Sequence, residues 1–166
     1  MNYEQLAKII FDEMKPKLEN NNGLSIFARE RAKFEGWLKV ELCESLSKYF
    51  SDIIPENKRI DVTFDKWALQ LKTINTNIRF ANVENKSRPI TMNTQGVIED
   101  IRKLRKLRSI NFQNKAVLFV VFPITHDNKN WQIQLTRIIK ALKKEPMHVD
   151  FKFKNEVPGV IYFGLV

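Results

Sequence analysis

The sequence predicts a single α/β domain with helices on both faces of a sheet. Segments with apolar residues at helical spacing alternate along the chain with shorter segments of period-two or continuous apolar character. One of these, residues 116–122, is apolar at every position, which is typical of a central strand covered on both faces. The chain of 166 residues has the usual size of one domain, and no repeat or linker divides it.

Two helices are predicted ahead of the first strand. Between Tyr3 and Leu18 apolar residues recur at helical spacing, and the polar turn 20–23 ends this first helix. A longer helix follows, with Ser25 as its candidate N-cap, and continues until Pro55 closes it.

An antiparallel hairpin is predicted around the turn 65–66. The flanking segments 60–64 and 67–74 both alternate with period two, and a symmetric turn pairs them so that Asp61 faces Gln70. The face that we expect to lie on a core is fully apolar: Ile60, Val62, Phe64, Trp67, Leu69 and Leu71. The opposite face is mostly polar: Arg59, Asp61, Thr63, Ala68, Gln70 and Lys72.

The second half of the chain continues the alternation of helices and strands. Residues 77–83 are a candidate continuation of the sheet, and residues 84–89 are a polar loop. The elements expected after this loop are a helix over about 94–108, the strand 116–122, a helix over about 131–142 and two closing strands, 149–153 and 160–166.

Composition and charge exclude several classes of protein. No run of about 18 apolar residues exists, so no transmembrane span is predicted, and the single cysteine excludes a disulfide framework. The first residues show no secretory signal, so we expect a cytoplasmic protein without a membrane partner. Lysine and arginine number 28 against 19 acidic residues, a formal net charge of +9, which favours a polyanionic partner.

Scarce residue types limit the chemistry further. Five dispersed glycines exclude a phosphate-cradling loop, and two histidines with one cysteine exclude a tetrahedral zinc set. We interpret His126 as a surface-loop residue and His148 and Cys43 as structural, and we expect Asp100 to pair with a nearby base. An enzyme of this composition would depend on carboxylates, lysine and a hard cation.

The polar face of the hairpin offers a site of that kind. Directly opposed residues have Cβ atoms about 4.5–5.5 Å apart and diagonal neighbours about 7–8 Å, so Asp61, Gln70 and Lys72 are expected to converge. Oxygens of Asp61 and Gln70 would share one Mg²⁺. The ammonium group of Lys72 would stand beside the ion and stabilise charge developing on a phosphate.

Asp61, eight intervening residues and then Gln70-Leu71-Lys72 together resemble the motif of the PD-(D/E)XK, or restriction-endonuclease-like, nuclease superfamily. The order of helix, strands, helix and strand over about 28–122 fits this resemblance. It implies a three-layer core with a central mixed sheet flanked by helices. An extra N-terminal helix (1–22) and a C-terminal helix with closing strands (123–166) would complete one nuclease-like domain.

The resemblance also implies roles for single residues. Asp61, Gln70 and the backbone carbonyl of Leu71 would bind Mg²⁺, or alternatively Mn²⁺, and Lys72 would help to activate the attacking water. A further metal-associated carboxylate would come from the preceding helix, with Glu35 as the first candidate and Glu41 in reserve. Two features depart from the motif: an amide stands at Gln70 where a carboxylate is commoner, and no proline precedes Asp61.

A basic strip on the later helix completes the leading hypothesis. Its side chains project opposite the apolar face of that helix: Arg102, Lys103, Arg105 and Lys106. Such a strip would bind DNA phosphates independently of sequence. We therefore expect a Mg²⁺-dependent endonuclease of the restriction, repair or mobile-element type, with a homodimer or a larger nuclease complex as the form suited to cutting two strands.

Other interpretations of the same residues stay open. The amide at Gln70 motivates a catalytically inactive nuclease-like module that binds nucleic acid or a protein partner. That module would bind DNA through the basic strip. In a purely structural interpretation, the polar hairpin face and the basic strip are solvated surfaces, with Asp61 paired to a base and Glu35 bonded to an arginine such as Arg31. A small structural or assembly protein without nucleic acid is the third interpretation.

Overall fold

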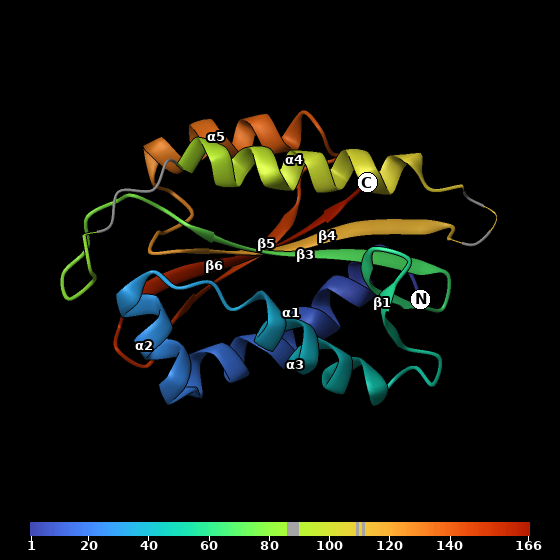
Figure 1. The fold of residues 1–166 in the computed structure, drawn as a ribbon, viewed down its shortest axis with the longest axis horizontal. Coiled ribbons are helices and arrows are strands. Elements are labelled where there is room, and N and C mark those ends of the chain that lie inside the picture. The colour runs from blue at the N-terminus through green and yellow to red at the C-terminus, as the bar shows by residue number, and fades with distance from the viewer. Residues whose placement is uncertain (86–89, 109, 111) are drawn as a thin grey trace.

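A computed structural model describes residues 1–85, 90–108, 110 and 112–166, and it has three layers with the sheet in the middle (Figure 1). One face of the sheet is covered by α1 (Tyr3–Asn20), α2 (Asn22–Glu30) and α3 (Glu35–Ser47), and the other face by α4 (Ile90–Lys106) and α5 (Lys129–Ile139). The strands are β1 (Ile54–Asn57), β2 (Ile60–Phe64), β3 (Trp67–Asn75), β4 (Asn114–Phe122), β5 (Met147–Lys152) and β6 (Pro158–Leu165).

The six strands form one mixed sheet in the order β1-β2-β3-β4-β6-β5. β3 and β4 run parallel, with α4 between them in the chain, and the other neighbouring pairs are antiparallel. The predicted α/β class is therefore confirmed. The hairpin register is confirmed from Phe64–Trp67 to Val62–Leu69, but the expected pair of Asp61 with Gln70 is not part of the observed pairing of β2 with β3.

Two hydrophobic cores lie on the two faces of the sheet. Along β4, Leu118 packs with the α1–α3 layer while Val117 and Phe119 pack with the α4–α5 layer. Every residue of β4 from Ala116 to Phe122 is fully buried, which confirms the central strand predicted from its continuous apolar sequence. Among the described helices, none has an apolar stretch of the length that crossing a bilayer requires.

The predicted long helix before the hairpin is wrong, because the chain forms two helices there. The side chain of Asn21 caps α2 by accepting the N–H of Leu24 at 3.0 Å, so the N-cap precedes Ser25 by four residues. α2 then ends at Arg31, which adopts a left-handed conformation with φ of 52°. Pro55 belongs to β1, an edge strand that the sequence patterns did not predict.

Two further expectations about the sheet need correction. Residues 77–83 do not continue it, because β3 ends at Asn75. Ile60 lies in the α4–α5 core and not beside Val62, since pairing with β3 ends at Val62 and the remaining part of β2 turns away. Of the predicted loop 84–89, residues 86–89 lie outside the described residues.

The first helix is joined to the last strand. The hydroxyl of Tyr3 donates to the carbonyl of Phe163 at 2.5 Å, and the two rings stack with centroids 5.3 Å apart. The same hydroxyl accepts the N–H of Met147, the first residue of β5, at 3.3 Å. α1 therefore closes the core over the two C-terminal strands.

Arg31 is 1% exposed and binds three backbone carbonyls after β3. Its guanidinium donates to Thr76, to Ile78 at 2.6 Å and to Glu84 at 2.6 Å. The side chain of Asn75 in turn donates to the carbonyl of Arg31. Arg31 thus satisfies carbonyls in a segment that has no strand partner of its own.

We expect Arg31→Met to lower the free energy of unfolding by about 3 kcal/mol, because buried carbonyls would lose charge-assisted hydrogen bonds. Arg29→Met is the matched control on the same helix, since Arg29 is half exposed and pairs only with the adjacent Glu30 in the contacts described. Its effect should stay below about 0.5 kcal/mol. Urea unfolding measures both, and equal effects would contradict a clamping role for Arg31.

Candidate functional site

Two carboxylates meet the open edge of β3. Beyond the Val62–Leu69 pair β2 no longer follows β3, and Asp61 Oδ2 accepts the N–H of Leu71 at 2.8 Å. One strand repeat further, Glu35 Oε1 accepts the N–H of Thr73 at 3.1 Å. Alternate residues of a strand point to the same edge, so these two anchors are about 6.6 Å apart.

Lys39 neutralises this acidic edge. It lies one helical turn after Glu35, and its ammonium group is 2.9 Å from Asp61 Oδ1 and also pairs with Glu56. Burial favours the neutral amine, but the hydrogen bonds to Glu56 and Asp61 outweigh it and raise the pKa of Lys39. The group that faces Asp61 is therefore a firmly protonated lysine.

The side chains of Gln70 and Lys72 lie on the α4 side of the sheet. Lys72 Nζ is 3.3 Å from Asp100 Oδ2, and Lys103 Nζ is 2.9 Å from Asp100 Oδ1. These two ion pairs confirm that Asp100, which is 4% exposed, pairs with bases. Gln70 Nε2 donates to the backbone carbonyl of Arg59 at 2.7 Å.

The structure thus separates residues that we expected to converge. Asp61 pairs with Lys39, Lys72 with Asp100, and Gln70 with the backbone at the β1–β2 turn. It does bring Asp61 to the N–H of Leu71 and Glu35 to the N–H of Thr73 on the same edge. Glu41, the reserve candidate, instead pairs with Lys17 of α1 at 2.6 Å.

An oxygen-only set of donors lies at the edge of β3. A strand residue directs its N–H and C=O to the same edge, so the carbonyl of Leu71 accompanies the carboxylates of Asp61 and Glu35. These donors fit Mg²⁺, although no cluster of three or more acidic, histidine or cysteine side chains occurs among the described residues.

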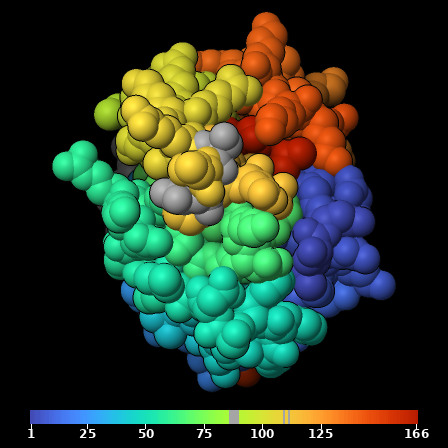
Figure 2. All heavy atoms as spheres, turned by 90° about the vertical axis from the view of Figure 1, so that its right-hand side faces the viewer, coloured from blue at the N-terminus to red at the C-terminus, as the bar shows by residue number. Residues whose placement is uncertain are grey.

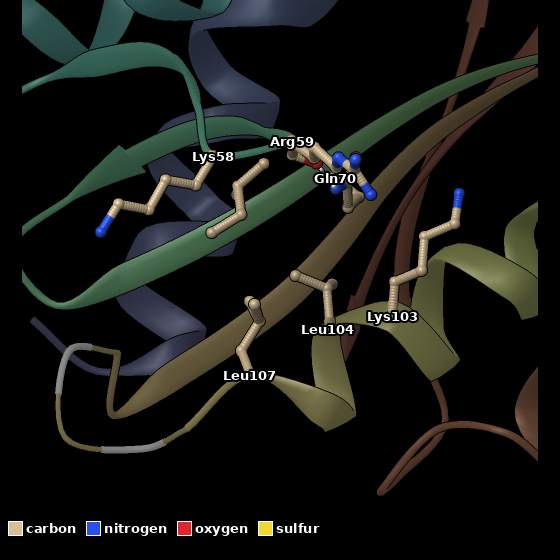
Figure 3. Close-up of a pocket in the computed structure, with 7 residues that line it drawn as sticks. Lys58, Arg59, Gln70, Lys103, Leu104 and Leu107 are labelled. Carbon is tan, nitrogen blue, oxygen red and sulfur yellow. Dashed lines mark hydrogen bonds between the residues drawn. The ribbon is translucent and has the colours of Figure 1, made fainter.

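A pocket of about 410 Å³ lies between α4 and the strand edge (Figure 3). Arg59 and Gln70 sit together on the strand side, and Lys103 extends from α4 toward them. Leu104 of α4 and Leu107, the residue that follows α4, point toward the strands. The remaining lining residues are Lys58 and Ile60.

The predicted basic strip lies beside this pocket. Its four side chains are exposed on the C-terminal half of α4: Arg102, Lys103, Arg105 and Lys106. Figure 2 shows this end of α4, in yellow, directly above the region of the β2–β3 turn, in green. The strip and the hairpin therefore share one side of the molecule.

Some residues of the site were not found by sequence reasoning. Lys39 could have been noticed from its spacing of four residues after Glu35, but its bond to Asp61 depends on how α3 packs on β2. Arg59 was placed on the polar hairpin face, and no pattern indicated that its carbonyl would bind Gln70.

The two histidines form a separate cluster. The rings of His126 and His148 stack at 3.6 Å, and His126 Nδ1 is 2.9 Å from the hydroxyl of Tyr162. That hydroxyl also accepts the indole N–H of Trp131 at 2.7 Å. His126 is thus part of a partly buried aromatic cluster, and both histidines have structural contacts.

Comparison of the chain with protein-family models, with curated proteins and with solved structures gave no match.

We expect Asp100→Asn to lower the free energy of unfolding by about 1–3 kcal/mol, because the partly buried ammonium of Lys72 would lose its carboxylate partner. The neighbouring Glu99→Gln should change it by less than about 0.5 kcal/mol, since Glu99 is exposed. Chemical denaturation at low salt measures both. Equal effects would show that Asp100 is not a required counter-ion.

The histidine cluster predicts a pH dependence of stability. Burial, together with the charge of His126, lowers the pKa of His148 below its ordinary 6.5 despite the opposing charges of Asp150 and Glu145. The unfolded chain therefore binds a proton that the folded protein rejects, and stability falls as the pH drops below about 6.5. Urea unfolding about one unit above and below this value should show a smaller fall for His148→Gln than for the wild type.

Proposed function

We propose that the protein is a Mg²⁺-dependent endonuclease that hydrolyses DNA phosphodiester bonds. The observation that carries the proposal is the placement of the carboxylates of Asp61 and Glu35 on neighbouring N–H groups at the open edge of β3. The order α3, three antiparallel strands, α4 and the parallel strand β4 supports it, because this is the order of the restriction-endonuclease-like core that the motif resembles.

Glu35, Asp61 and the carbonyl of Leu71 are the residues that would hold the ion. Bound there, Mg²⁺ would polarise a phosphate oxygen and lower the pKa of an attacking water. Lys39 would leave Asp61 and keep Glu56 as its partner. Gln70 lies on the α4 side, where its amide donates to the carbonyl of Arg59 and so supports the β1–β2 turn.

The cationic groups on the α4 side account for the anionic substrate. The buried carboxylate of Asp100 holds Lys72, and a fixed ammonium group stabilises charge developing on a phosphate. The exposed strip of α4 would bind the DNA backbone through its phosphates. Neighbouring segments of one strand would thus contact the strip and the edge of β3.

A second candidate is a nuclease-like module that binds DNA without cutting it. It is favoured by the ion pair between Lys39 and Asp61, because that ammonium already supplies a positive charge at the edge of β3. The neutral amide at Gln70 points the same way. This candidate keeps salt-sensitive DNA binding through α4 and lacks dependence on a divalent ion.

The two candidates differ in Mg²⁺-dependent cleavage. We expect the wild type to cut DNA with Mg²⁺ or Mn²⁺, and Asp61→Asn, Glu35→Gln and Lys72→Met each to reduce the rate at least about a hundredfold. The amide side chains of Asp61→Asn and Glu35→Gln retain an oxygen that can accept the N–H groups of β3. These two variants therefore remove the negative charge and keep the fold intact. Gel assays on plasmid, linear duplex and single-stranded DNA measure the rates.

Glu41→Gln is the matched control for Glu35→Gln. It changes the same residue type on the same helix, but Glu41 pairs with Lys17, so cleavage should stay within about twofold of the wild type. A wild-type protein that is inert on all three DNA forms, yet binds DNA, would replace the nuclease proposal with the binding module.

A further inference from the structure

The pocket beside the basic strip combines two kinds of surface. Its volume of about 410 Å³ falls within the range of small-molecule sites. Polar groups come from Arg59, Gln70 and Lys103, and apolar walls from Ile60, Leu104 and Leu107 (Figure 3). A phosphate alone would use only the first set, and an apolar ligand only the second.

Two of the polar groups, Lys103 and Gln70, are held in place before any ligand binds. Lys103 donates to the buried Asp100 at 2.9 Å, and this hydrogen bond and charge raise the pKa of Lys103. The amide of Gln70 donates to the carbonyl of Arg59 at 2.7 Å. That bond leaves Gln70 with a carbonyl oxygen and a second N–H, which together can contact both donors and acceptors of a ligand.

The turn that carries two of the cations is strained. Lys58 and Arg59 link the paired residues Asn57 and Ile60 and have φ values of 49° and 72°. Such a two-residue turn favours Asn-Gly, because a left-handed conformation brings the Cβ of an L-residue close to the following carbonyl oxygen. Strain of this kind is concentrated at binding and catalytic sites.

We propose that this pocket binds one unpaired nucleotide of a DNA strand. The base lies against Ile60, Leu104 and Leu107, and its phosphate lies between Arg59 and Lys103. A base in a duplex is stacked and paired, so only an unpaired base reaches such a pocket. The choice of DNA as the polymer rests on the proposed function, whereas the preference for a phosphate joined to a flat apolar ring rests on the pocket itself.

Binding is tested in EDTA, so that cleavage plays no part. Fluorescence anisotropy compares a labelled single strand with a duplex of the same length, and unlabelled dTMP and inorganic phosphate serve as competitors. We expect the single strand to bind about tenfold more tightly than the duplex. When the two competitors are added at the same concentration, dTMP should displace the labelled single strand, and inorganic phosphate should not.

Three variants separate the pocket from general charge. Lys58→Asn with Arg59→Gly relieves the turn and removes both cations, so stability should rise while single-strand binding falls about tenfold. Asp65→Asn with Lys66→Gly places the same Asn-Gly pair in the other two-residue turn, whose φ values are 38° and 64°, without changing the net charge, and should raise stability without altering binding. Leu107→Ala keeps every charge and should weaken both single-strand binding and competition by dTMP, while duplex binding stays unchanged.

Equal affinity for single strand and duplex would overturn the proposal, as would competition by phosphate as strong as that by dTMP. Competition by dTMP without a preference for the single strand would assign the pocket to free nucleotides and overturn binding of a strand. In another outcome, the wild type prefers the single strand, loses this preference in Leu107→Ala, and cuts no DNA. That outcome would support nucleotide binding in the pocket and reject the nuclease proposal. If the wild type cuts DNA but shows no preference for the single strand, nucleotide binding in the pocket is rejected and the nuclease proposal stands.

Discussion

The backbone N–H groups at the open edge of β3 determine how the centre of this protein is built. The residues of β2 before Val62 do not pair with β3, so the N–H groups of Leu71 and Thr73 need other acceptors. Asp61 from β2 and Glu35 from α3 provide them, so two negative charges are fixed at one edge by the hydrogen-bonding needs of the strand. Lys39 balances that charge here, and in our proposal a divalent cation takes its place.

The sheet divides the charged groups into two sets with different surroundings. On the α3 side, Lys39 faces the carboxylates, whereas on the α4 side the buried Asp100 holds Lys72 and Lys103. A substrate at the strand edge would meet acids from one layer and bases from the other. The same division explains why opposed positions in a hairpin did not suffice to predict contacts, since side chains on either side of β3 belong to different layers.

The sequence predicted those features that local rules determine. The hairpin register follows from a two-residue turn, and the buried central strand from a continuous apolar run. The break between α2 and α3 was missed because the left-handed conformation of Arg31 is stabilised by carbonyls more than forty residues away. The Lys39–Asp61 pair was equally inaccessible, since it depends on the docking of α3. Glu35 lies beside β3 although the helix begins at this residue and not near Ser25. Its position next to the apolar face of the helix was enough to predict that it lies near the strands.

The contact between Tyr3 and Phe163 has a consequence for how the chain reaches this fold. The partners are 160 residues apart, so during synthesis α1 emerges long before the strand on which it packs. The part of its apolar face that packs on β5 and β6 stays uncovered until these two strands have been synthesised, whereas α3, which also packs on α1, follows it closely in the chain. Because contacts of such sequence separation close a long loop, the packing of α1 on β6 carries a larger entropic cost than its packing on α3.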